Sequence, residues 1–356
     1  MLNTCYNIRM YKPKFTISNE LLLKIAEIEA LRSQIDSSYI LPEREIEMRY
    51  RASVEATHSS TSIEGNPLNL KQVEKVLIDG KELTRHQYAE IEVKNYKTAL
   101  DWIETRKATK NSIALADILA IHKIVSDKLL PTEKVGTLRE NPIYITDQND
   151  NTVYDGPEAI TLDVEIDELL KWLNESDAIH PIIVAGILHF HFVSIHPFAD
   201  GNGRTTRLLT NLYLGLKDYD LRSSLVLESY YSVDKQAYYD ALSLANNYAE
   251  RKIATLNPWI EYFVDGFLSS AKVLAIEVTA LSGLAPGVEK VKISKEESDI
   301  LSYAKQFGSI SLAEAQDLLT GASKRTVQRR LMKLVDDRYL VIEGEARNTK
   351  YVWKSN

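Results

Sequence analysis

Apolar residues recur at helical spacing along most of the chain, and this periodicity predicts a mainly α-helical protein. The first predicted helices cover 21–35 and 44–63. The second of these ends before Glu64-Gly65-Asn66-Pro67, because a glycine followed by a proline is a strong stop signal for a helix. Further helices are predicted over 117–130, 163–175, 182–195, 204–216, 232–250 and 258–280.

Two segments depart from this spacing. Residues 141–157 alternate between apolar and polar around an Asp-Gln-Asn-Asp-Asn turn, which predicts a small β-hairpin near 142–155. Residues 292–356 predict three helices followed by a second hairpin, and this is the order of elements in a winged helix.

These patterns divide the chain of 356 residues into four parts, in keeping with a prior of two to three domains for this length. We expect an N-terminal helical extension over 1–110, a helical core with the hairpin over 111–280, a linker over 281–291, and a winged-helix domain over 292–356.

The charge of the chain is divided in the same way. The net charge is −7, yet residues 289–356 carry 13 basic and 10 acidic residues, whereas residues 1–288 carry 30 and 40. The overall acidity argues against a surface that binds nucleic acid everywhere, but this argument does not apply to the C-terminal segment. With 44% apolar and 26% charged residues, the composition is that of a globular protein and excludes collagen-like and low-complexity classes.

The chain shows no sign of a membrane or secretory segment. The N-terminus has no apolar signal core, and the apolar stretch 181–195 is too short to cross a bilayer and contains His189 and His191. These two histidines lie two residues apart on a helix and face different sides, which favours structural roles over a metal site. The single Cys5 cannot form an internal disulfide, so we expect a cytoplasmic protein.

One stretch between two predicted helices carries most of the candidate chemistry. It runs His196-Pro-Phe-Ala-Asp-Gly-Asn-Gly-Arg-Thr-Thr-Arg207. Gly201 and Gly203 allow the backbone to approach a ligand closely, and the amides that begin the next helix make an anion site. Arg204 and Arg207 are three residues apart on one helix face, as suits the binding of phosphate oxygens.

Two further side chains complete this picture. Asp200 supplies a hard oxygen ligand, and Mg²⁺ is usually bound by one or two carboxylates together with substrate phosphates. His196 is the side chain best suited to accept a proton near neutral pH. The stretch therefore predicts a site for a polyphosphate, Mg²⁺ and a general base.

This stretch resembles the motif of the Fic family, HxFx(D/E)GNGRxxR, and matches it at every defined position. The resemblance extends over roughly 15–280, because the N-terminal helices are similar to the family's N-terminal extension. It implies a protein adenylyltransferase, which transfers AMP from ATP to a Ser, Thr or Tyr hydroxyl of a target protein (AMPylation), with ATP as co-substrate and Mg²⁺ as cofactor. Kinase-like relatives have lysine where this chain has Gly203, which argues against that branch.

The resemblance also implies a role for each residue of the motif. His196 would deprotonate the target hydroxyl, Asp200 would bind Mg²⁺ between the α- and β-phosphates, and Phe198 would anchor the loop in the core. The residues that contact the phosphates would be Gly201, Asn202 and Gly203 as the anion hole, Arg204 at the β-phosphate and Arg207 at the γ-phosphate.

Two other regions are similar to the family. The hairpin near 142–155 corresponds to the family's flap, which binds a target segment as an added strand. Residues 237–247 resemble the helix of the adenine pocket, where Tyr239 and Asn246 would lie seven residues apart on one face and contact adenine. A simple core position for Tyr239 remains the alternative.

The segment from Ser60 to Asn66 resembles the family's inhibitory motif, [S/T]xxxE[G/N], with Ser60, Glu64 and Gly65 at the defined positions. Its place before the Fic motif resembles the self-inhibited class. Glu64 would pair with Arg207 and occupy the arginine that should bind the γ-phosphate, so that ATP binds in a non-productive pose.

Two other functions stay open at this point. The same His196 and Glu64 could position a water and remove AMP from a modified target. The last predicted helix of the winged-helix domain has five basic residues. They form either a solvated face or a surface that enters a DNA major groove. The second alternative would make the chain a DNA-binding regulator with a nucleotide-sensing core. These residues are Lys324, Arg325, Arg329, Arg330 and Lys333. Winged helices also bind proteins, and the sequence leaves the target and a homodimer undecided.

Overall fold

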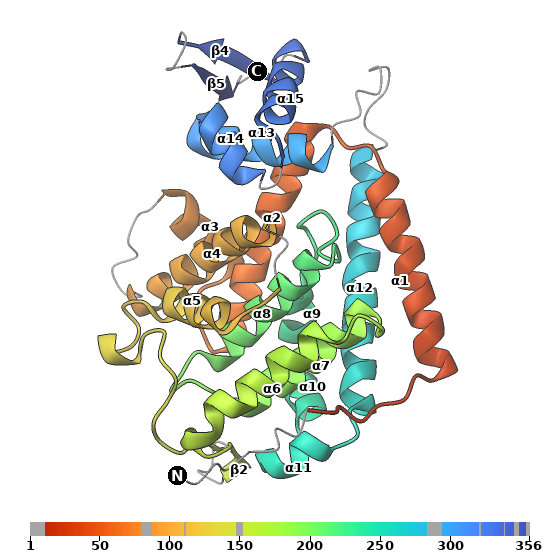
Figure 1. Cartoon of the computed structure of the whole chain (residues 1–356), viewed down its shortest axis with the longest axis vertical. Helices are drawn as coiled ribbons and strands as arrows, with labels where there is room; N and C mark the ends of the chain where they lie inside the picture. Colours follow the sequence, from red (N-terminus) through yellow and green to blue (C-terminus); the bar gives the residue numbers. More distant parts are fainter. Residues whose placement is uncertain are drawn as a thin grey trace, which may run out of the picture.

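The computed structural model describes residues 11–79, 87–109, 112–146, 152–282, 294–319, 322–337, 339–344 and 349–353. The fold is mainly helical with small antiparallel strand pairs, so the predicted fold class is confirmed (Figure 1). The N-terminal helices are α1 (Asn19–Ser37), α2 (Pro42–Ile63), α3 (Leu70–Asp79), α4 (Gln87–Lys107) and α5 (Leu115–Ser126). The middle of the chain contains η1 (Thr132–Lys134), β1 (Tyr144–Thr146), β2 (Thr152–Asp155), η2 (Ala159–Thr161), α6 (Leu162–Asn174), α7 (Pro181–Ile195), α8 (Asn202–Leu216), α9 (Leu227–Val233), α10 (Lys235–Leu242), α11 (Tyr248–Ile253) and α12 (Asn257–Ser282).

Helix α7 lies at the centre of the main core. Its residues are apolar on every side and nearly all are buried, as expected of a helix that neighbours cover all round. Helices α6, α8 and α12 pack against it, and α1 runs along α12 at the side of the molecule (Figure 1). Because one hydrophobic cluster includes buried residues from Tyr11 to Val278, helices on both sides of residue 110 share a core. The domain boundary placed there stays a prediction.

Two predicted helices differ from the structure. The helix predicted over 117–130 ends at Ser126, and Lys128 adopts a left-handed backbone with φ of 58°. The helix predicted over 232–250 is divided among α9, α10 and α11. Asp234 caps α10 by accepting the N–H of Ala237 at 2.9 Å, and Asn247 caps α11 by accepting the N–H of Glu250 at 2.9 Å. These caps start new helices, because Asp and Asn side chains compete for backbone amides.

The hairpin predicted near 142–155 is present as β1 and β2, which pair antiparallel with Ile145 opposite Tyr154; residues 147–151 lie outside the described residues. We call this hairpin the flap. Tyr154 fixes it to the core, since its hydroxyl donates to the carbonyl of Ser194 at 2.5 Å. The guanidinium of Arg251 lies 3.8 Å above the Tyr154 ring, an arrangement that cation–π attraction favours.

Residues 294–353 form a separate group of elements that we call the C-terminal unit. It comprises α13 (Lys295–Phe307), β3 (Ser309–Ser311), α14 (Leu312–Leu318), α15 (Lys324–Asp336), β4 (Leu340–Glu343) and β5 (Lys350–Trp353). The three helices and the hairpin follow the predicted order, but the sequence analysis missed β3, which extends the sheet to the order β3-β5-β4. Of the linker predicted over 281–291, residues 281 and 282 belong to α12 and the remainder lies outside the described residues.

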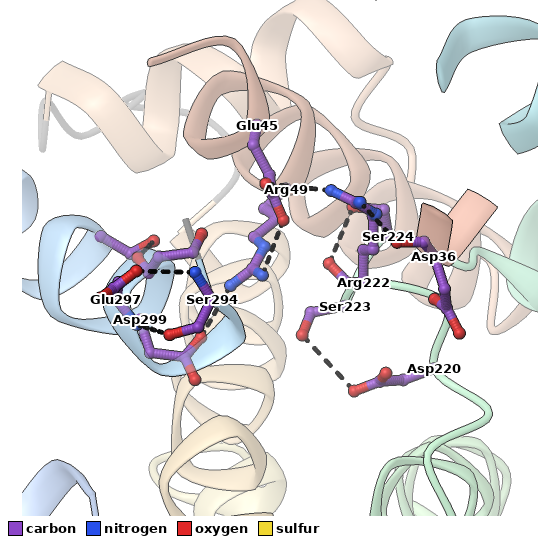
Figure 2. A network of polar contacts seen from close by, with 12 residues as sticks. Asp36, Glu45, Arg49, Asp220, Arg222, Ser223, Ser224, Ser294, Glu297 and Asp299 are labelled. Carbon is purple, nitrogen blue, oxygen red and sulfur yellow. Dashed lines mark hydrogen bonds and ion pairs between the residues drawn. The ribbon is translucent and has the colours of Figure 1, made fainter. Parts of the chain in front are cut away.

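The C-terminal unit docks on the N-terminal end of α2. Ile46 of α2 is part of the unit's hydrophobic core, and beside it Arg49 Nη1 donates to Asp299 Oδ1 of α13 at 2.9 Å (Figure 2). Arg49 also pairs with Glu45 at 3.0 Å, and Glu45 pairs with Arg222, from the loop after α8, at 3.1 Å. Helix α2 therefore contacts the C-terminal unit at one end and carries the candidate inhibitory motif at the other.

Among the described residues, no helix combines the length and the apolar character that crossing a membrane requires.

Candidate active site

The candidate site is built on the loop that joins α7 to α8. His196 ends α7 in a left-handed conformation with φ of 48°, and its carbonyl accepts a hydrogen bond from Arg139 Nε at 2.9 Å. Phe198 is fully buried. The Asn202 side chain closes the loop, because its Oδ1 accepts the Phe198 N–H at 2.9 Å and its Nδ2 donates to the Phe198 carbonyl at 2.8 Å. Asn202 thus shapes the loop through its side chain and leaves its backbone amide to the anion site.

His196 is half-buried at the mouth of this loop. Its Nδ1 lies 3.1 Å from the carbonyl of Val193, an acceptor, so Nδ1 carries the proton and Nε2 keeps a free lone pair. Desolvation lowers the pKa of His196 to about 4. The imidazole is therefore neutral at pH 7 and is able to accept a proton at Nε2.

The start of α8 has the geometry of an anion site. Gly201 has φ of 78° and immediately precedes the helix, so the first backbone amides of α8, at Asn202, Gly203 and Arg204, have no acceptor within the helix. Beside them Asp200 is 53% exposed at its side chain. Its Oδ1 accepts the Gly201 N–H at 2.6 Å, and its Oδ2 lies 3.5 Å from Arg204 Nη2. An exposed carboxylate beside the first amides of a helix suits Mg²⁺ that is bound together with phosphates.

Glu64 and Arg207 form an ion pair over this site. Arg207 is 2% exposed, and its Nη2 donates to Glu64 Oε1 at 2.7 Å. Ser60 supports the same guanidinium, since its Oγ accepts from Nε at 2.7 Å and its carbonyl from Nη2 at 3.1 Å. Burial raises the pKa of Glu64, but the attraction of Arg207, and then of Arg204, outweighs it and lowers the pKa below its ordinary value. Glu64 is therefore ionised in this pair.

The Glu64 carboxylate lies directly over the start of α8. A Cβ added at Gly203 would overlap Glu64 Oε1 and would approach Arg207 Nη1 to 3.2 Å. Because the overlapped atom is the end of a flexible side chain, we expect Gly203→Ala to displace Glu64 from Arg207 and to lower the free energy of unfolding by about 1 kcal/mol, the low end of the usual cost of overpacking. In a Glu64→Gly background the loss should be much smaller, and chemical denaturation of the four proteins measures both values. Equal losses in the two backgrounds would show that Glu64 does not occupy this space.

Arg204 has a partner that sequence reasoning missed. Its Nη1 lies 2.8 Å from Oε1 of Glu92 on α4, and both side chains are less than 10% exposed. The other carboxylate oxygen, Oε2, accepts from Asn66 Nδ2 at 2.7 Å. Burial raises the pKa of Glu92, although Arg204 opposes the shift. Arg207 thus faces Glu64, whereas Arg204 faces Glu92 and, at longer distance, Asp200.

His122 of α5 is a second residue that the sequence did not reveal. Its ring stacks on Phe198 at 3.6 Å, and its Nδ1 accepts the Gly136 N–H at 3.1 Å. Nε2 must then carry the proton, and it lies 3.1 Å from the carbonyl of Asp200. The segment from Gly136 to Arg139 is therefore connected to the loop in two ways. One connection runs through His122, and the other is the hydrogen bond from Arg139 to the carbonyl of His196.

The burial of His122 predicts a pH dependence of stability. Desolvation lowers its pKa to about 4, below the value of about 6.5 in an unfolded chain. The folded state therefore binds this proton less readily than the unfolded state. As a result, the free energy of unfolding is highest above pH 6.5 and falls by about 3 kcal/mol as the pH decreases to 4. Urea unfolding of the wild type and His122→Gln at pH 7, 5 and 4 measures this, and the variant should lose less stability over this range. Parallel losses would contradict the assignment.

The two residues proposed for the adenine pocket are not on one helix, so the argument from their spacing was wrong. Tyr239 is on α10 and 44% exposed, with its hydroxyl 3.4 Å from the carbonyl of Ile63 within the candidate inhibitory motif. Asn246 follows α10, and its carbonyl accepts the N–H of Asp155 in the flap at 2.9 Å. A role of either in binding adenine stays a prediction.

His189 and His191 are fully buried in α7. The ring of His189 contacts Thr210 Oγ1 at 3.1 Å and the Tyr238 hydroxyl at 2.9 Å, and His191 stacks on Tyr11 at 3.7 Å. In the part of the chain that the structure describes, no group of three or more His, Cys, Asp or Glu side chains could bind a metal ion.

Comparison with known proteins gives a consistent family. The model of the Fic/DOC family matches residues 112–214. A protein adenylyltransferase Fic from Aedes aegypti is 31% identical over 245 residues, which are 67% of this chain and 44% of that protein. The protein adenylyltransferase Fic from Drosophila melanogaster is 28% identical over 303 residues, 82% of this chain and 56% of that protein. The chain thus spans about half the length of the curated relatives it matches.

Solved structures share the fold. A Fic family protein from Desulfovibrio desulfuricans G20 superposes with a TM-score of 0.65 at 23% identity and covers 97% of this chain and 99% of its own. Fic-1 (aa134–508) from C. elegans has a TM-score of 0.56 at 24% identity and covers 72% of each chain. The likeness to the first structure therefore extends over nearly every element described above.

Proposed function

This chain belongs to the Fic/DOC family, and from that membership we propose that it is a protein adenylyltransferase that moves AMP from ATP to a Ser, Thr or Tyr hydroxyl of a target protein. One observation carries the proposal. A single loop presents a neutral histidine, the free amides of a helix start and two buried arginines within one site. These are the groups that transfer of a nucleotidyl group to a hydroxyl requires.

His196 is the general base in this proposal. Its Nδ1 is turned to the Val193 carbonyl, so Nε2 takes the proton of the target hydroxyl as the hydroxyl oxygen attacks the α-phosphorus. The bond from the α-phosphorus to the bridging oxygen breaks, and pyrophosphate leaves in line with the attacking oxygen. Positioning and charge stabilisation supply most of the rate in such reactions.

The phosphates would lie against the start of α8. The amides of Gly203 and Arg204 face the negative charge, Arg204 binds the β-phosphate and Arg207 the γ-phosphate. Asp200 would hold Mg²⁺, which would supply positive charge to the phosphates of the bound nucleotide. Both arginines are at present paired with carboxylates, so ATP must compete with Glu64 and Glu92 for them.

The target segment would add to the flap along β1. The N–H of Asp155 on β2 already bonds to Asn246, so that end of the outer edge of β2 is covered. Tyr144 and Thr146 of β1 are exposed. Main-chain bonds to a strand edge align a hydroxyl without selecting much sequence.

The test is mass spectrometry of a cell lysate incubated with ATP and the Glu64→Gly variant, in which the inhibitory pair is absent. We expect peptides that carry an AMP adduct on Ser, Thr or Tyr. The same variant with His196→Ala added is the control, and it should yield none. Equal adducts from both proteins, or from neither, would contradict the proposal.

The C-terminal unit supports a second proposal, that it is a winged helix whose α15 contacts duplex DNA. Lys324, Arg325 and Arg329 are exposed on α15, whereas Arg330 and Lys333 pair with Glu296 and Glu297 of α13 at 3.4 and 2.9 Å. We expect a gel shift that weakens as salt rises and is lost in Arg325→Ala with Arg329→Ala, because phosphate contacts release counterions. Absence of binding to any duplex at low salt would exclude this partner.

A further inference from the structure

Asn66 ties the turn after α2 to helix α4. Its Oδ1 accepts the N–H of Leu68 at 3.1 Å, which shapes the turn locally. Its Nδ2 donates to the carbonyl of Ala89 at 3.0 Å and to Glu92 Oε2 at 2.7 Å, and both acceptors belong to α4. A hydrogen bond to an ionised acceptor contributes more than one between neutral groups, so the contact to Glu92 is the stronger of the two.

Glu92 is placed to serve two partners. Its side chain is 8% exposed and lies between Arg204 Nη1 at 2.8 Å and Asn66 Nδ2 at 2.7 Å, with one carboxylate oxygen toward each. A buried carboxylate needs such partners, because it has lost its hydration. The same side chain therefore contacts a candidate phosphate-binding arginine and the residue two positions after Glu64.

Gly65 gives the turn that carries Glu64 a left-handed bend, with φ of 93°. The backbone here is restrained by hydrogen bonds. These include the Asn66 N–H to the Thr61 carbonyl at 3.1 Å and the two side-chain bonds of Asn66 to α4.

We propose that the contact between Asn66 and Glu92 is a latch that keeps Glu64 on Arg207, with Glu92 as a positioning residue for the inhibited state. The proposal rests on the proposed function, because a latch has an effect on catalysis only if Glu64 inhibits transfer. Releasing the latch frees the turn at Gly65, which lets Glu64 leave Arg207 more often and lets ATP take the arginine.

The test compares AMP incorporation from α-labelled ATP into lysate proteins by six forms of the full chain. Asn66→Asp retains the acceptor for the Leu68 N–H but removes the donor and sets a like charge against Glu92. We expect it to raise transfer about tenfold over the wild type, equivalent to about 1.4 kcal/mol. Asn66→Ala should raise it about fivefold.

Asn69→Ala is the matched control, since Asn69 caps α3 through the N–H of Gln72 at 3.1 Å, and its rate of transfer should not differ from that of the wild type. Glu64→Gly with Asn66→Asp should equal Glu64→Gly alone.

Hydrogen exchange supplies a readout that does not depend on catalysis. In Asn66→Asp the amides of Glu64, Gly65 and Asn66 should exchange faster, whereas those of α3 should not. Two results would refute the latch. In the first, Glu64→Gly raises transfer, but Asn66→Asp neither raises transfer nor speeds this exchange. In the second, adding Asn66→Asp to Glu64→Gly raises transfer by the same factor as it does in the wild type. If Glu64→Gly itself fails to raise transfer while exchange is faster, the inhibitory role of Glu64 has failed and the contact is structural only.

Discussion

Replacing His196 with alanine is expected to reduce the rate of AMP transfer about 10³-fold, near the middle of the range for loss of a general base. The reason lies in the proton that the attacking hydroxyl must lose. His196 presents a neutral Nε2 because Val193 fixes the tautomer and burial lowers the pKa to about 4. His196 is the only histidine between Ile195, the last residue of α7, and Asn202, the first residue of α8.

This experiment should be made in the Glu64→Gly background, where the starting rate is high enough to measure a large loss. Affinity for ATP, followed by calorimetry, should stay within about threefold, since the phosphates bind α8 and the arginines. The parent rate should change little between pH 6 and 8, because a base with a pKa of about 4 is already deprotonated there. A rate that survives in His196→Ala, or one that rises tenfold per pH unit over this range, would remove His196 from the role of base.

Replacing Glu64 with glycine is expected to raise AMP transfer about 100-fold, which corresponds to about 2.7 kcal/mol. The pair it removes is short and buried on the arginine side, with Arg207 2% exposed and 2.7 Å from a carboxylate whose side chain is 28% exposed. Breaking such a pair for an incoming phosphate costs energy that turnover must supply in the wild type. Labelled ATP and a common lysate measure both rates, and Glu64→Gln, which keeps the shape but not the charge, should give an intermediate rate.

Glu64→Gly should also lower the thermal stability of the protein, and this change serves as a control for the rate measurement. Without Glu64 the buried Arg207 has only the Ser60 oxygens as partners among those described above, so the melting temperature should fall. ATP should then raise it by more than in the wild type, because γ-phosphate replaces the missing negative charge. The variant also separates transfer from the removal of AMP, since removal would need Glu64 to position a water and should be lost. An unchanged transfer rate, with this thermal behaviour intact, would mean that the pair is structural.

The sequence placed Glu64 beside Arg207, as the structure has them, but missed the side chains that come from distant helices; the roles of these residues stay predictions. The motif from His196 to Arg207 and the Glu64 turn are short, and their chemistry follows from residue types at fixed spacing. Glu92 on α4 and His122 on α5 reach the site from other elements, and the bond of Asn66 to α4 was not predicted. In the sequence Glu92 is one of several acidic residues on a helix that also carries charges for solvent, and no spacing distinguishes it.

Helix boundaries failed where a polar side chain competed with apolar periodicity. Asp234 and Asn247 are ordinary helix caps, yet the apolar residues around them continue the helical pattern. The prediction followed the pattern and joined three helices into one, which placed Tyr239 and Asn246 on a common face. β3 was missed for a related reason, because Ser311 caps α14 and the three-residue strand before it is too short to show alternation.

Helix α2 belongs to all three hydrophobic clusters of the described residues, with Ile46 in that of the C-terminal unit, Met48 and Ile63 in the main one and Val54 in the third. Loss of this helix would disrupt every one of them, so the stability of the C-terminal unit is coupled to that of the helix that carries the Glu64 turn. Any ligand that binds the folded C-terminal unit must then stabilise the helix that presents Glu64, by thermodynamic linkage. Cutting the chain after α12 would expose Ile46 and deprive Arg49 of Asp299. The isolated catalytic part is thus a different thermodynamic system from the whole protein.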